Sequence, residues 1–152
     1  MTEKNAEVFI SKLKVEIFRQ LEMLYESATK TTRDQRVTMD ARYPTSIALE
    51  KQQRWAKGRS QPEQELPVKL ETHIYLDHLS GELDIWHSDD ALFANGESNA
   101  QFGDGTKVER FQVLGDDPAL AGYKVSKAGK TLYLDGLVTH ILKPIFDAPN
   151  TI

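Results

Sequence analysis

The chain has 152 residues, of which 39% are hydrophobic and 28% charged, and it contains no cysteine. This composition is typical of one soluble folded domain, and it excludes disulfides, thiolate nucleophiles and cysteine-based zinc sites. The net charge of −4 disfavours a general nucleic-acid binder. No run approaches the roughly 20 apolar residues that span a bilayer, and the first residues lack an apolar signal segment. We therefore expect a cytoplasmic protein that does not contact a membrane.

The beginning of the chain predicts one long helix over residues 3–30. Thr2 can cap this helix, neither Gly nor Pro interrupts it, and apolar residues recur at spacings of three and four. The apolar stripe of this helix is wider than packing against one surface requires, because apolar residues also lie beside it. We therefore expect that a homo-oligomer can form through this helix. The residues that broaden the apolar stripe are Phe9, Phe18, Met23 and Tyr25.

A second, shorter helix is predicted over residues 47–57, after a loop or frayed helix over 31–42. A Pro-Thr-Ser sequence precedes it as a start signal, and Gly58 follows it where helices commonly end. Basic residues beside an aromatic ring on this helix are candidate binding residues, and this combination can also hold single-stranded nucleic acid. The candidates are Lys51, Arg54, Trp55 and Lys57.

Beyond residue 66 the apolar period changes from helical to alternating, which predicts strands. The hairpin-length connections between them favour antiparallel order. Residues 137–142 fit either a last strand or a helix capped by Asp135, and their β-branched residues favour the strand. A connector is predicted at 59–67 and a loop at 95–105. Single helical turns are predicted at 88–96 and from 117–118 onward. The predicted strands cover 68–77, 82–87, 107–114, 123–125 and 130–134.

The first two of these strands predict a hairpin with a defined register. A four-residue turn over 78–81 keeps one face of the pair apolar, whereas a two-residue turn places two aspartates directly opposite each other. We choose the four-residue turn because like charges in opposite positions destabilise a sheet. The other face then carries what we call the aromatic cluster, with His73 opposite Trp86 and Tyr75 opposite Asp84.

The aromatic cluster has a structural interpretation and two functional ones. In the structural interpretation, a helix or loop covers these side chains. If they are exposed, Tyr and Trp commonly anchor protein partners, and a His beside a carboxylate can act as a general base. The spacing of the four histidines matches no metal motif, and there is no glycine-rich phosphate loop, so we expect neither a metal nor a cofactor.

Together these patterns predict a single α+β domain over residues 1–152, helical over 1–60 and mainly β over 66–143. A long N-terminal helix and a shorter helix are expected to pack on one mostly antiparallel sheet of about four to six strands. The sequence has a basic segment at 30–59 and an acidic segment at 88–117, and it contains no recognisable catalytic motif. This uneven distribution of charge favours a non-enzymatic protein-binding module, such as an inhibitor, immunity-type protein, adaptor or chaperone-like partner. The alternatives are a small enzyme using His73 with Asp84, and a nucleic-acid accessory protein using the basic segment 30–59.

Overall fold

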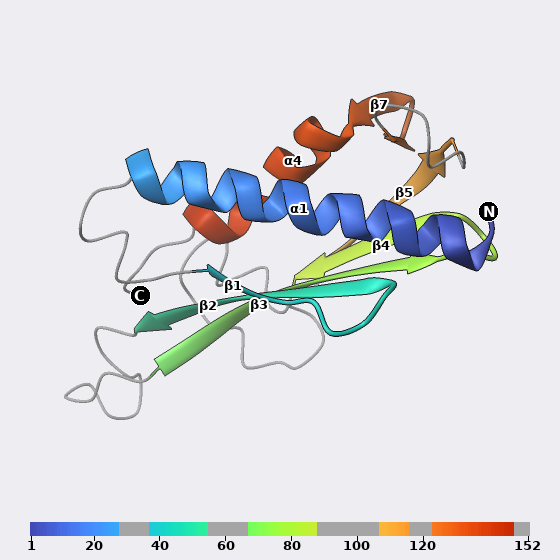
Figure 1. Ribbon diagram of the computed structural model, residues 1–152. Helices are drawn as coiled ribbons and strands as arrows, with labels where there is room; N and C mark the ends of the chain where they lie inside the picture. The colour runs from blue at the N-terminus through green and yellow to red at the C-terminus, as the bar shows by residue number, and fades with distance from the viewer. Residues whose placement is uncertain (28–36, 55–66, 88–106, 116–122, 148–152) are drawn as a thin grey trace.

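The computed structural model describes residues 1–27, 37–54, 67–87, 107–115 and 123–147. Two helices, α1 (Glu3–Ser27) and α4 (Leu134–Asp147), lie on one face of a single antiparallel sheet (Figure 1). The sheet has seven strands, each hydrogen-bonded to the next along the chain. The predicted fold class is confirmed, with more strands than expected. The strands are β1 (Val37–Asp40), β2 (Ser46–Arg54), β3 (Pro67–Asp77), β4 (Glu82–His87), β5 (Lys107–Leu114), β6 (Lys124–Lys127) and β7 (Lys130–Tyr133).

The long helix α1 follows the prediction up to Ser27, and residues 28–30 lie outside the described part of the chain. The hydroxyl of Thr2 accepts a hydrogen bond from the backbone N–H of Asn5 at 3.1 Å, which satisfies a donor that the first turn leaves open. Among the described residues, no helix combines the length and apolarity that a membrane span requires. The buried stripe of α1 consists of Ala6, Phe9, Ile10, Leu13, Ile17 and Leu21.

The prediction of a last strand at 137–142 is wrong, because residues 134–147 form α4. The β-branched residues there favour a strand only weakly, and burial of a helical apolar stripe outweighs that preference. Pro144 lies inside α4 and has no N–H to donate to the carbonyl of residue 140, so the last turn of the helix lacks that hydrogen bond. The buried stripe of α4 consists of Leu137, Val138, Ile141, Leu142 and Ile145.

The helix predicted at 47–57 is also wrong over its described part, which is strand β2. Its backbone pairs with β3 over nine positions, from Ser46 opposite Tyr75 to Arg54 opposite Pro67. This ladder joins segments about 20 residues apart, so local start and stop signals cannot reveal it. The short strand β1, which pairs with β2, lies where a loop or frayed helix is predicted. Both strands fall within the 1–60 part whose predicted structure is helical.

The remaining predicted strands correspond to β3–β7. In the tight turn between β6 and β7, Ala128 and Gly129 both have positive φ, at 49° and 81°. The predicted turns at 88–96 and 117–118, the loop at 95–105 and the connector up to residue 66 lie outside the described residues.

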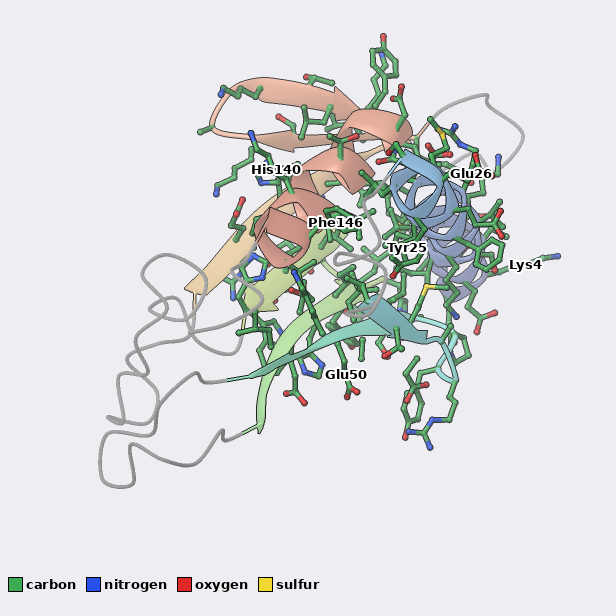
Figure 2. All side chains as sticks on the ribbon, turned by 90° about the vertical axis from the view of Figure 1, so that its left-hand side faces the viewer. Lys4, Tyr25, Glu26, Glu50, His140 and Phe146 are labelled. Carbon is green, nitrogen blue, oxygen red and sulfur yellow. The ribbon has the colours of Figure 1, made fainter. Side chains whose placement is uncertain are left out.

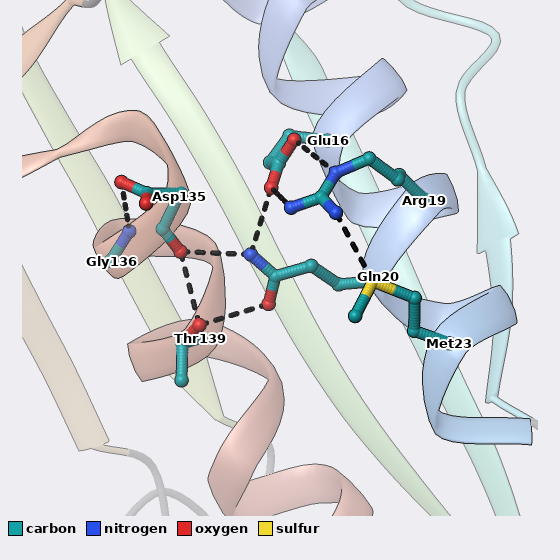
Figure 3. A network of polar contacts seen from close by, with 7 residues as sticks. All are labelled: Glu16, Arg19, Gln20, Met23, Asp135, Gly136 and Thr139. Atoms are coloured by element: carbon teal, nitrogen blue, oxygen red, sulfur yellow. Dashed lines mark hydrogen bonds and ion pairs between the residues drawn. The ribbon is translucent and has the colours of Figure 1, made fainter. Parts of the chain in front are cut away.

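The two helices are joined to each other and to the sheet by side chains from distant parts of the chain. The Gln20 amide donates to the backbone oxygen of Asp135 at 2.8 Å and accepts from the Thr139 hydroxyl at 2.9 Å (Figure 3). On the other side of α1, the Tyr25 hydroxyl accepts from the N–H of Val37 at 2.7 Å and so fixes the edge strand β1. These bonds hold both helices over one face of the sheet, which we call the inner face. The opposite, outer face carries the strand side chains that alternate with the core residues.

The buried polar side chains of Thr72, His87 and Glu109 have hydrogen-bond partners on the inner face, which offsets the cost of burying them. The Thr72 hydroxyl and Nδ1 of His87 lie 2.8 Å apart on neighbouring strands. The carboxylate of Glu109 contacts Nε2 of His140 at 2.7 Å and the ammonium of Lys127 at 3.1 Å. This last group ties α4 and β6 to β5.

Acid is expected to weaken the fold partly through Glu109. Burial raises the pKa of this carboxyl, but hydrogen bonds from His140 and Lys127 outweigh burial and hold the pKa below its ordinary value. A carboxyl whose pKa is lower in the folded chain stabilises the fold above its unfolded pKa of about 4.3, and this contribution disappears as the pH falls through the folded pKa. Thermal unfolding between about pH 7 and about pH 3 should therefore show a smaller loss of Tm in Glu109→Gln than in the wild type. Identical pH profiles would contradict this role.

Candidate functional site

The candidate site lies on the outer face of the sheet, which points away from α1 and α4. Along β2, Ile47 and Leu49 are buried, and the residues between and after them, Ala48 and Glu50, face outward. Figure 2 shows Glu50 on the opposite side of the sheet from Phe146 of α4. Among the described residues, no helix packs on this outer face.

The aromatic cluster forms in the predicted register. His73 lies opposite Trp86, and Tyr75 lies opposite Asp84, across β3 and β4. The rings of His73 and Trp86 are stacked, with centroids 4.2 Å apart and planes inclined by 15°. Tyr75 is 48% exposed and Trp86 36% exposed. Within the described part of the chain, the cluster is therefore a partly open aromatic surface that no helix or loop buries.

The charges around the cluster separate its histidine from its aspartate. Oδ1 of Asp84 accepts a hydrogen bond from Nε of Arg110 at 2.8 Å, which raises the pKa of that guanidinium. Nε2 of His73 lies 3.4 Å from a carboxylate oxygen of Glu71. No hydrogen bond joins His73 to Asp84, so these two described residues do not form the acid–base pair that the enzyme hypothesis requires.

A hollow of about 550 Å³ adjoins the aromatic cluster. Next to β1, the guanidinium of Arg42 donates two hydrogen bonds to the carboxylate of Asp40, from Nη2 to Oδ2 at 2.7 Å and from Nε to Oδ1 at 3.0 Å. The hydrogen bond from Arg42 is the main reason that the pKa of Asp40 lies below its ordinary value. Besides the cluster and this ion pair, the lining includes Tyr43, Ser46, Ile47, Ala48, Glu50 and Ile74.

Of the four residues predicted for a basic binding face, the structure describes the side chain of Lys51, and this side chain is buried, with an exposure of 1%. Lys51 occupies an inward position of β2, in step with Ile47 and Leu49, and its ammonium donates to the backbone oxygen of Phe146 at 3.0 Å. The apolar alternation before Lys51 is the sequence signal for this orientation. Arg54 ends β2, and its side chain lies outside the described part, as do Trp55 and Lys57.

Sequence reasoning missed the four charged residues that surround the aromatic cluster: Asp40, Arg42, Glu50 and Arg110. They come from β1, β2, β5 and the turn after β1, whose registers depend on pairing between distant segments.

Within the described ranges, no three His, Asp or Glu side chains gather as a metal site would require. The chain matches no protein-family model, no curated protein and no solved structure. The geometry of the outer face is therefore the basis for inferring a function.

Proposed function

We propose that the protein is a non-enzymatic binding module that uses the aromatic cluster and the adjoining hollow to bind another protein. The observation that carries this proposal is the His73–Trp86 stack beside an exposed Tyr75, on the face that the helices leave open. Tyr and Trp are enriched at binding hot spots because they bury a large area with few rotatable bonds. The stack fixes the Trp86 ring before binding, which lowers the entropy lost in a complex.

The contacts of Asp84 favour binding over catalysis. The Asp84 carboxylate is paired with Arg110 and makes no hydrogen bond to His73, so it does not orient that imidazole, whereas exposed ion pairs of this kind are common at the rim of protein interfaces. An inhibitor, an immunity-type protein, an adaptor or a chaperone-like partner would each use such a face. Because a chain without cysteine suits a reducing compartment, we place the interaction in the cytoplasm.

Truncation of Trp86 should greatly reduce capture of the partner. In a tagged pull-down from the native cell extract, quantified by mass spectrometry, Trp86→Ala should weaken binding about thirtyfold, because loss of a hot-spot residue costs about 2 kcal/mol. Tyr133→Ala is the matched control, since Tyr133 is an exposed aromatic on β7 that does not line the hollow. Circular dichroism should show both variants folded.

The proposal fails if the wild type and Trp86→Ala capture the same proteins in the same amounts. It also fails if Tyr133→Ala loses the partner to the same extent, because the effect would then not belong to the outer face around the hollow.

A second candidate function is self-association through α1. Val15 and Phe18 are 70% and 58% exposed, and residues three apart lie on the same side of a helix. This apolar flank is available to a second copy of the chain. Sedimentation velocity should show a dimer that Phe18→Glu converts to a monomer, since a charge placed in an apolar interface remains desolvated. A wild type that sediments as a monomer at all accessible concentrations would contradict self-association.

A further inference from the structure

The outer face from β1 to β5 carries more negative than positive charge. By register, the outward positions of these strands and the turn after β1 hold six carboxylic acids and four basic residues, Arg42, Arg54, Lys69 and Arg110. Like charges also face each other across neighbouring strands, with Asp77 directly opposite Glu82. Such pairs destabilise a sheet slightly, and a cation placed over them removes that repulsion. The six carboxylates are those of Asp40, Glu50, Glu71, Asp77, Glu82 and Asp84.

The aromatic rings favour one kind of cation. A guanidinium is planar, stacks on aromatic faces and binds carboxylates through two parallel hydrogen bonds, whereas an ammonium does neither as well. The hollow offers both features, since the exposed ring of Tyr75 and the carboxylates of Asp40 and Asp84 all belong to its lining. The chain's own Arg42 and Arg110 already bind these two carboxylates, with side chains 77% and 65% exposed.

A guanidinium of a partner can replace Arg42 or Arg110 in these two ion pairs. Exposed ion pairs contribute little to stability, because water screens them and long side chains lose entropy in forming them. An incoming guanidinium can therefore share or replace the partners of Asp40 and Asp84 at small cost. Phosphate groups, in contrast, are repelled by this face.

We infer that the partner presents a basic, arginine-bearing segment to the outer face, and that the hollow beside the aromatic cluster takes one arginine side chain. This inference rests on the proposed protein-binding function and specifies the chemistry of the partner. The charge of the face attracts the segment, and the Tyr75, Trp86 and Asp84 side chains select arginine within it.

Peptides of defined charge test the selection directly. The probes are an acetylated arginine-glycine repeat peptide and lysine-glycine and glutamate-glycine peptides of equal length, titrated into the ¹⁵N-labelled full chain. The arginine peptide should shift the Trp86 indole and the backbone signals of His73 and Tyr75 in a saturable way. Its affinity should fall at least about tenfold between about 0.05 M and about 0.5 M salt, and the lysine peptide should bind about fivefold more weakly.

Neutralising the face should reduce the affinity for the arginine peptide without unfolding the chain. Asp84→Asn and Glu50→Gln should each weaken binding about fivefold, the usual scale for one partly exposed charge pair. Glu22→Gln is the matched control, because Glu22 is an exposed carboxylate on α1, on the opposite side of the sheet. The inference is overturned if the arginine peptide gives no saturable shifts at the cluster, or if the glutamate peptide binds as well as the arginine peptide.

The same variants separate this inference from the proposed function. If Trp86→Ala abolishes capture of the cellular partner, but neither Asp84→Asn nor high salt reduces capture, the face binds a protein and the basic-segment inference fails. If capture is unchanged by Trp86→Ala, the proposed function itself fails. If the captured partner is a second copy of this chain, the same salt and Asp84→Asn tests decide whether its contact is basic.

Discussion

Replacement of Phe9 by alanine is expected to lower the free energy of unfolding by about 3–5 kcal/mol. Phe9 is completely buried on the core side of α1, and its ring meets the Tyr123 ring edge to face with centroids 5.0 Å apart. The substitution removes the buried ring, leaves a cavity beneath α1 and breaks the aromatic pair. Because interiors are close-packed, the neighbouring side chains can close only part of that cavity.

Phe18→Ala provides a control with the same change of side chain on the same helix. Phe18 lies on the solvent side of α1, so in the monomer, at protein concentrations too low for self-association, its truncation should change the free energy of unfolding by no more than about 0.5 kcal/mol. Urea unfolding followed by far-ultraviolet circular dichroism measures both variants, and equal m-values justify the comparison. Equal losses in the two variants would mean that α1 does not pack on the sheet by its Phe9 side.

Replacement of Lys51 by alanine is expected to lower the free energy of unfolding by about 2–4 kcal/mol. The aliphatic part of Lys51 is buried on the inner face, and its ammonium donates to the Phe146 carbonyl near the end of α4. A cation at this end also interacts favourably with the helix dipole. The alanine variant loses the packing, the hydrogen bond and the charge together.

Lys51→Met separates these contributions, because methionine keeps most of the apolar stem and cannot donate. It should cost about half as much as the alanine variant, since losing the donor is partly offset by no longer burying a charge. Both variants are compared by the same urea unfolding. A loss below about 0.5 kcal/mol in Lys51→Ala would contradict the buried position, as surface substitutions have effects of that size.

The parts of the fold that the sequence predicts well are those specified by local patterns. The helical spacing of α1 and the alternation of β3 and β4 each lie within one short window. The hairpin register also follows from nearby residues, because the four-residue turn pairs Leu76 with Leu83 and Ile74 with Ile85 on the inner face. It does so although Asp77 then lies opposite Glu82. These local signals suffice to place His73, Tyr75, Asp84 and Trp86 on one face of the sheet.

The parts that the sequence predicts poorly depend on distant contacts. Residues 47–54 carry helix signals at both ends, yet β3 supplies a ladder that converts them to a strand. The β-branched residues of α4 favour a strand, yet α1 and the sheet bury its helical stripe. The contact between Arg110 and Asp84 also depends on distant residues. It forms only through the pairing of β4 with β5, whose opposed residues are about 20 or more positions apart.

The bond between Gln20 and residue 135 spans 115 positions of the chain, and this separation has a consequence for synthesis. Of the described elements, the ribosome produces α1 before the strands, the strands follow in their spatial order, and α4 comes after them. Each hairpin can form as it emerges, but the inner side of the sheet lacks the cover of α4 until that helix has left the exit tunnel. Until then the nascent chain exposes apolar surface on this side of the sheet, and the core is complete only once α4 has emerged.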